Sequence, residues 1–266
     1  MPEISVIMAI YNCADTVACA IDSILNQTYS DWELILCDDG SVDDTYKIAQ
    51  EYKNKYPDKI KLIKNHSNLG LPASLNNCLK EAEGKYIARM DGDDISTPER
   101  FEMQINFLKS NPDIDCVGTG MTRFDENGDF ENLYSAENPD RFILKMYPVC
   151  FHATLMMKKA CYDAIDGYIS HPRTLRCEDI DMWFRFTAAG FRAYNLQQCL
   201  YKVREDRKAL KRRKFKYTIC NVKTNLYGFR LLGYPVYLYP YTLKPIVSHF
   251  IPYRLKSKLR ELLHKA

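Results

Sequence analysis

YIARMDGDD, residues 86–94, is the stretch of this 266-residue chain on which the rest of the interpretation depends. It starts as an apolar run and ends with three carboxylates in four residues, Asp91, Asp93 and Asp94. A short apolar run that stops at a polar, glycine-containing turn is typical of a buried strand. We therefore expect a strand at 86–90 whose carboxyl end carries an acidic cluster.

Four more apolar or β-branched runs occur in the first 120 residues: Ile4–Ile10, Trp32–Cys37, Ile60–Ile63 and Cys116–Thr119. The segments between the runs have helical spacing, as Val17, Ile21 and Ile24 illustrate. Strands that alternate with helices of this length indicate βαβ units. The sequence thus predicts an α/β fold with a mostly parallel sheet.

Polar residues follow four of these five runs, namely those at 4–10, 32–37, 60–63 and 86–90. They are Tyr11 and Asn12, then Asp38 to Ser41, then Asn68 to Gly70, and finally Asp91 to Asp94. Parallel sheets bind ligands beyond the carboxyl ends of their strands. We expect these residues to converge on one rim of the sheet, and this convergence is a stronger signal than any single motif.

The acidic cluster at 91–94 has two interpretations. It is either a solvated turn before the next helix or a site where a divalent cation offsets the repulsion between the carboxylates. Mg²⁺ and Mn²⁺ prefer carboxylate oxygens and usually complete their shell with water and substrate phosphates. The place of the cluster at the predicted rim favours the cation, with a phosphate-bearing ligand.

Three other positions also allow a structural and a functional reading. Asp38 or Asp39 fits an Asx turn, or a carboxylate that accepts the imide N–H of uracil. Tyr11 fits plain packing, or stacking on a base. Glu178 and Asp179 fit charges favoured by a helix N-terminus, or a general base for an attacking hydroxyl. The sequence around each position leaves these alternatives open.

Residues 121–204 are expected to complete the sheet and cover the rim. Phe151–Met157 is β-like, and Glu178–Gly190 has the spacing of an amphipathic helix. His152 is the one histidine with a candidate site role. No GxGxxG, GxxxxGK[ST] or GxSxG motif occurs, so dinucleotide, P-loop and serine-hydrolase chemistry are not indicated.

Ten cysteines without a CxxC pair argue against a zinc site and fit a reducing cytosol. We expect neither a signal peptide nor a membrane-spanning helix.

Charge divides the chain at about residue 204. Residues 205–266 carry 15 Lys/Arg and 3 Asp/Glu, whereas the preceding part is net acidic. Arg207–Tyr217 holds seven cations, seven tyrosines lie at or after residue 217, and leucines from Leu255 to Leu263 have helical spacing. This composition predicts a helical appendage that contacts an anionic membrane surface. The alternative is packing on the body or on a second subunit, and nucleic-acid binding is not expected.

Taken together, the motifs resemble the family 2 glycosyltransferases, especially bacterial enzymes that assemble polysaccharides and cell-wall glycans. The matching segments are Ile4–Asn12, Ser23–Thr45, Asn68–Gly70, Tyr86–Asp94 and Gly167–Gly190. The resemblance implies a GT-A fold, with a Rossmann-like, mostly parallel sheet flanked by helices. It assigns residues 1–204 to this domain, with a nucleotide-binding half at 1–120 and an acceptor half at 121–204.

The resemblance also implies roles for single residues. Ala9, Tyr11, Asp39 and Asp91 contact the nucleotide, although Ala9 stands where a proline is frequent. Asp93 binds the metal together with Asp91, and the metal is Mn²⁺ or Mg²⁺. Asp94 extends the cluster toward the donor sugar, and Trp183 packs behind the helix at 178–190 or lines the acceptor cleft. His152, the one histidine nominated above, is the third residue expected to line the donor or acceptor site. Asp179 is the catalytic base, and its neighbour Glu178 is the second candidate.

The implied activity is metal-dependent, inverting transfer of a sugar from a UDP-sugar to a hydroxyl of a glycan, lipid-linked or protein-linked acceptor. Two alternatives are a sugar-nucleotide nucleotidyltransferase and an inactive homologue that serves as a membrane-associated assembly partner. The expected location is the cytoplasm, at the inner face of the cell membrane, and a homo-oligomer is compatible with the sequence.

Overall fold

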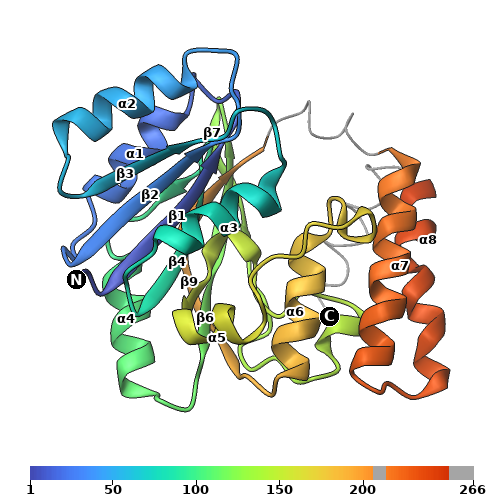
Figure 1. The fold of residues 1–266 in the computed structure, drawn as a ribbon. Helices are drawn as coiled ribbons and strands as arrows, with labels where there is room; N and C mark the ends of the chain where they lie inside the picture. Colours follow the sequence, from blue (N-terminus) through green and yellow to red (C-terminus); the bar gives the residue numbers. More distant parts are fainter. Residues whose placement is uncertain (206–213, 252–266) are drawn as a thin grey trace.

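The computed structural model describes residues 1–205 and 214–251. Within these ranges, six α-helices and all of the strands build a layered α/β body, and two further α-helices stand at one side of it (Figure 1). The strands are β1 (Ile4–Ile10), β2 (Trp32–Asp38), β3 (Ile60–Lys64), β4 (Tyr86–Asp91), β5 (Ile95–Ser96), β6 (Cys116–Asp125), β7 (Gly128–Leu133), β8 (Met156–Lys158) and β9 (Ala193–Arg204).

All nine strands belong to one sheet with the order β3-β2-β1-β4-β8-β6-β9-β5, and β7 pairs with β6. The first four strands of this order are parallel, and β6 and β9 are also parallel. The short strands β8 and β5 are antiparallel to their neighbours. The predicted α/β fold with a mostly parallel sheet is therefore confirmed, and β8 joins the β1–β4 half to the β6–β9 half.

Helices cover both faces of the sheet because side chains of a strand alternate between the two faces. Ile4, Val6 and Met8 of β1 enter a core with α1 (Val17–Leu25), α2 (Thr45–Lys55) and α4 (Arg100–Ser110). Ile7 enters the other core, with α3 (Leu71–Glu81), α5 (Lys159–Ala164) and α6 (Glu178–Ala188). The β-like segment expected at 151–157 is only partly a strand. His152–Thr154 forms a short 3₁₀ helix, and the strand β8 begins at Met156.

The C-terminal part packs on α6. It comprises α7 (Phe215–Leu231), a 3₁₀ segment at Val236–Leu243 and α8 (Lys244–Phe250), and α7 lies beyond α6 as seen from the sheet (Figure 1). Phe229 is buried in the same core as Phe184 of α6. Gly228 allows this contact, since a Cβ at this position would lie 2.1 Å from the ring of Phe184.

A helical C-terminal segment is thus present. The remainder of the basic run at 206–213 and the leucine-rich helix predicted within 252–266 lie outside the described residues. Among the residues that the structure does describe, no helix is both long enough and apolar enough to cross a bilayer.

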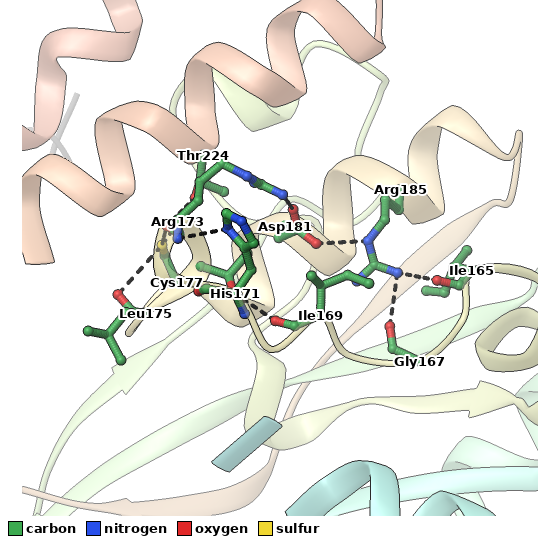
Figure 2. A network of polar contacts seen from close by, with 11 residues as sticks. Ile165, Gly167, Ile169, His171, Arg173, Leu175, Cys177, Asp181, Arg185 and Thr224 are labelled. Carbon is green, nitrogen blue, oxygen red and sulfur yellow. Dashed lines mark hydrogen bonds and ion pairs between the residues drawn. The ribbon is translucent and has the colours of Figure 1, made fainter. Parts of the chain in front are cut away.

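A buried carboxylate ties the loop before α6 to the helix itself (Figure 2). Asp181 is fully buried and forms ion pairs with Arg173 at 2.7 Å and with Arg185 at 2.8 Å. Arg185 also donates a 2.9 Å hydrogen bond to the carbonyl of Gly167. The carbonyl of Arg173 accepts a 2.9 Å bond from the hydroxyl of Thr224, so the same loop is fixed to α7.

Asp181→Asn should therefore destabilise the protein strongly. The substitution leaves two largely buried guanidinium groups without their counter-charge, which typically costs about 3–5 kcal/mol. The midpoint of urea unfolding measures the loss. Asp163→Asn is the matched control, because Asp163 forms an exposed i,i+4 pair with Lys159, and such pairs contribute less than about 1 kcal/mol. Equal losses in the two variants would contradict the role given to Asp181.

Candidate active site

A cavity of about 470 Å³ opens at the carboxyl ends of the parallel strands. Six of the residues that the sequence nominated line it: Ala9, Tyr11, Asp39, Asp91, Asp93 and Glu178. The register explains this convergence, since Ala9 of β1 pairs with Asp91 of β4, and Ile10 pairs with Asp38 of β2. The strands end level with one another, so the loops that follow them meet at one rim.

Tyr11 and the residues around it form one wall of this cavity. Tyr11 is half-exposed, and its ring therefore has a surface open to a ligand. Asn12 adopts a positive φ of 47° and accepts a 2.9 Å hydrogen bond from the amide of Val42. Its own amide donates to the hydroxyl of Ser41 at 3.1 Å. These two bonds tie the loop after β1 to the loop after β2.

Asp39 holds the next loop in place. Its Oδ1 accepts bonds from the side-chain amide of Asn65 at 2.9 Å and the backbone amide of Leu69 at 2.8 Å, and its Oδ2 accepts from the amide of Gly70 at 2.9 Å. A carboxylate offers about four acceptor positions. One position on Oδ2 is left for a donor that enters the cavity.

Glycine is required in the turn that carries Asp39. Gly40 has a φ of +72°, and a Cβ there would lie 2.8 Å from the backbone of Ser67. The turn after β2 and the loop after β3 can approach this closely because the residue has no side chain.

Arg89 neutralises part of the acidic cluster. It lies on β4, is only 4% exposed, and contacts both carboxylate oxygens of Asp91 with its two terminal nitrogens. One carboxylate oxygen from each of Asp91, Asp93 and Asp94 lies within 4.8 Å of the other two. At this spacing like charges repel strongly, and the Arg89 guanidinium compensates for one of the three.

Asp94 points away from the cavity. Its two oxygens accept hydrogen bonds from the Tyr201 hydroxyl at 2.9 Å and from the Arg204 amide at 2.8 Å, both on β9. Burial, together with the charges of Asp91 and Asp93, raises the pKa of Asp94 to about 8. Asp94 therefore fastens the acidic turn to β9.

The arrangement fits a divalent cation that is shared with a ligand. Asp93 is exposed and lines the cavity, and each oxygen of Asp91 keeps a lone pair beside its contact with Arg89. The carboxyl group of Asp93 is partly desolvated by the surrounding protein although the residue is exposed, and this, together with the charge of Asp91, raises its pKa. A cation at this position would stabilise the ionised form. Mg²⁺ and Mn²⁺ commonly take one or two carboxylates and complete their shell with phosphate oxygens and water.

A second cavity, of about 540 Å³, adjoins the first. Arg176 and Tyr217 line both of them. The start of α6 lies at this junction, so that Glu178 faces the first cavity whereas Asp179 faces the second. Consecutive residues at a helix start point in different directions, and this separates the two carboxylates.

Both carboxylates at the start of α6 have raised pKa values. For Asp179 the cause is burial, and the positive charge of Arg89 offsets part of the rise. For Glu178 burial acts together with the negative charge of Asp179. A carboxylate with a raised pKa is a better proton acceptor than an ordinary one, which suits a general base.

Three nominated residues, Asp94, His152 and Trp183, line neither cavity. Trp183 is fully buried, so the structure places it in the core behind α6 and not at the cleft. His152 bonds the hydroxyl of Tyr168 through Nε2 at 2.7 Å, and burial holds its pKa well below the ordinary value. Asp94 and His152 already have hydrogen-bond partners within the protein, and Trp183 packs in the core, so the three residues lie behind the site.

Arg89, Arg176 and Tyr217 are among the residues at the site that were not nominated from the sequence. Arg89 gave a signal, since an arginine inside an otherwise apolar strand needs a buried partner. Arg176 and Tyr217 gave none, because their contact depends on how α7 packs near α6. Arg176 adopts a positive φ of 62°, which is uncommon for a residue other than glycine, asparagine or aspartate.

Comparisons with known proteins agree with this geometry. Residues 5–177 match the family model described as glycosyl transferase family 2. The chain is 50% identical to the putative glycosyltransferase EpsE of Bacillus subtilis, over 94% of this chain and 90% of that protein. It is 28% identical to WfaP of Escherichia coli, a UDP-Glc:alpha-D-GlcNAc-diphosphoundecaprenol beta-1,3-glucosyltransferase, over 96% of this chain and 99% of WfaP.

The fold is also similar to that of solved glycosyltransferases. The mannosyltransferase PcManGT of Pyrobaculum calidifontis, in complex with GDP-Man and Mn²⁺, superposes with a TM-score of 0.68 at 16% identity, covering 100% of this chain and 80% of that one. The GT-A fold expected from the motifs is therefore confirmed. Because the family model covers most of the chain and spans the residues of the first cavity up to Leu175 and Arg176, the protein belongs to glycosyl transferase family 2 and is a glycosyltransferase.

Proposed function

We propose that this glycosyltransferase uses a UDP-sugar and a divalent cation, and that it transfers the sugar with inversion to a hydroxyl group in polysaccharide biosynthesis. The observation that carries the proposal is the pair of adjoining cavities, one lined by Tyr11, Asp39 and Asp93 and the other by Asp179. The donor occupies the first cavity and the acceptor the second. The names of relatives such as WfaP support the donor and the acceptor classes.

The first cavity suits uridine diphosphate. Tyr11 offers an exposed ring for the base, and Asp39 keeps one acceptor position for the imide N–H of uracil. Asp93, with Asp91 beside it, would hold the cation, which when bound stabilises the charge that develops on the departing diphosphate. Arg89 holds the carboxylate of Asp91 in a fixed position through their ion pair.

The second cavity suits the acceptor. Asp179 takes the proton of the attacking hydroxyl, and the hydroxyl oxygen bonds to the anomeric carbon as the bond to the diphosphate breaks. Attack from the face opposite the diphosphate inverts the configuration in one displacement. The raised pKa of Asp179 supports its role as the base, and Glu178, on the donor side, contributes charge and position.

The direct test measures release of the nucleoside diphosphate in Mn²⁺: UDP from a panel of UDP-sugars, and GDP from GDP-mannose as the comparison donor. We expect release from one or more UDP-sugars and none from GDP-mannose. Activity with GDP-mannose alone would contradict the assignment of uridine. Absence of any release, with an acceptor extract present, would favour an inactive assembly partner.

For the proposed glycosyltransferase, the most economical location is the cytoplasmic face of the cell membrane, where lipid-linked acceptors are extended.

Asp93→Ala should abolish the metal-dependent part of UDP binding. The variant removes the exposed carboxylate of the cluster, so its affinity for UDP in Mn²⁺ should fall to the value that the wild type shows with a chelator. Isothermal titration calorimetry measures both. Asp58→Ala is the control, because Asp58 is exposed and lines none of the cavities described. A variant that keeps the Mn²⁺-dependent gain in affinity would overturn the assignment.

Asp179→Asn should lower kcat by about 10²–10⁴-fold, the usual contribution of a general base. UDP binding should be unchanged, since Asp179 faces the second cavity. Glu178→Gln provides the comparison and should have the smaller effect on kcat. If Glu178→Gln is the more damaging of the two, the roles of the neighbours are reversed.

Sugar transfer should also depend on pH in a specific direction. The base works only when deprotonated, and burial raises the pKa of Asp179 above that of an ordinary aspartate, about 3.9. The acid limb of the kcat–pH profile should therefore lie above the range in which exposed aspartates titrate, with the rate increasing as pH rises through it. An acid limb near pH 4 would show that a solvated carboxylate serves as the base.

A further inference from the structure

The second cavity is positively charged, although it borders the acidic donor site. Its walls come from residues 144–148, the start of α6, the start of α7 and one face of α8. The lining includes four cations, Lys145, Arg176, Lys214 and Lys244, against a single carboxylate, Asp179. Low-dielectric walls with one sign of charge concentrate the field and attract ligands of the opposite charge.

The four cations come from four different segments of the chain. Lys244, at the start of α8, donates to the carbonyl of Met146 and lies 4.8 Å from the ring centre of Tyr147. It thus fastens α8 to the segment that carries Lys145. Lys214 lies at the start of α7, and Arg176 precedes α6. Because the four segments are far apart in the sequence, it is the tertiary packing of the protein that gathers their positive charges at one cavity.

Arg176 is held in a conformation that costs energy. Its φ of 62° places it in the left-handed region, and residues kept there at functional sites are maintained by the structure around them. The preceding loop is fixed by the Arg173–Asp181–Arg185 network, and the following residue, Cys177, bonds the hydroxyl of Thr224 at 3.3 Å. This support keeps Arg176 at the junction of the two cavities.

We infer that the second cavity binds a phosphate or diphosphate group of the acceptor. This inference rests on the proposed function, and it specifies the class of acceptor. A diphosphate carries negative charge at neutral pH and presents oxygens that lysine and arginine donors can bind. A sugar attached to such a group would then present a hydroxyl to Asp179, which lines the same cavity.

The surroundings of the cavity favour a lipid as the source of that group. Lys244, Pro245, Ser248 and His249 of α8 face the cavity, whereas Val247 is 61% exposed and Phe250 72% exposed on the remaining surface of the same helix. Just before α8, Val236 and Tyr237 are 81% and 75% exposed. Exposed apolar and aromatic side chains beside lysines are typical of a segment that lies at a membrane interface.

The test measures binding of three probes by isothermal titration calorimetry, with a chelator present so that metal-dependent binding in the donor cavity is removed. The probes are inorganic pyrophosphate, farnesyl diphosphate and farnesol. We expect both diphosphates to bind and farnesol not to bind. Tighter binding of farnesyl diphosphate than of pyrophosphate identifies a lipid source, and equal binding identifies the diphosphate alone as the determinant.

The informative variants are Arg176→Gly and the double variant Lys145→Gln/Lys214→Gln. Glycine suits the positive φ at 176, so Arg176→Gly removes the guanidinium without adding strain. We expect each to weaken diphosphate binding roughly tenfold or more, a change of about 1.4 kcal/mol per factor of ten. Arg176→Lys should retain most of the affinity, and Lys47→Gln, on exposed α2, should not change it.

Two results would overturn the inference. One is failure of the wild type to bind either diphosphate while it still binds UDP with Mn²⁺, which would leave the proposed function intact. The other is displacement of the diphosphate by UDP in the presence of the chelator, which would place the probe in the donor cavity. Failure of UDP binding itself would instead reject the proposed function.

Discussion

The ion pair between Arg89 and Asp91 is the interaction on which the candidate active site depends. Three carboxylates, each with an oxygen within 4.8 Å of an oxygen of the other two, would repel each other and open the turn after β4. Arg89 is buried within the strand itself and contacts both oxygens of the first carboxylate. The third carboxylate, Asp94, is used to attach the turn to β9, so Asp93 is the one that remains exposed to a ligand. The buried guanidinium of Arg89 thus allows Asp94 to serve the structure while Asp93 stays open to a ligand.

A second constraint is the start of α6. This helix packs against the sheet on one side and against α7 on the other, and its first turn lies where the two cavities meet. Two adjacent acids at a helix start necessarily point in different directions, so one faces the donor side and the other the acceptor side. The buried ion pairs of Asp181, one turn further along, fix the orientation of this first turn. The chemistry of the site and the packing of the helix are therefore set by the same eleven-residue segment.

The sequence predicted the parts of the site that follow from strand ends. Tyr11, Asp39, Asp91 and Asp93 each come directly after an apolar run, and parallel strands with level ends must bring them together. It did not predict the second cavity, because that cavity depends on packing between segments far apart in the chain, such as Met146 and Lys244, which are separated by 98 residues. The resemblance left Trp183 either behind the helix or at the acceptor cleft, and His152 was nominated only as the one histidine with a candidate site role. Local sequence does not distinguish a tryptophan that faces the core from one that faces a ligand, and the burial of Trp183 decides the matter.

The close approach of Gly228 to Phe184 has a consequence for how enzymes of this shape diversify. The first turns of α7 form one side of the second cavity, and the distance between α7 and α6 is limited by an aromatic ring that sits against a bare backbone. Any side chain at position 228 acts as a spacer, forces the two helices apart and widens the cleft several turns away. The size of acceptor that fits can therefore be adjusted at a position that no acceptor touches, while the nucleotide half of the molecule stays as it is.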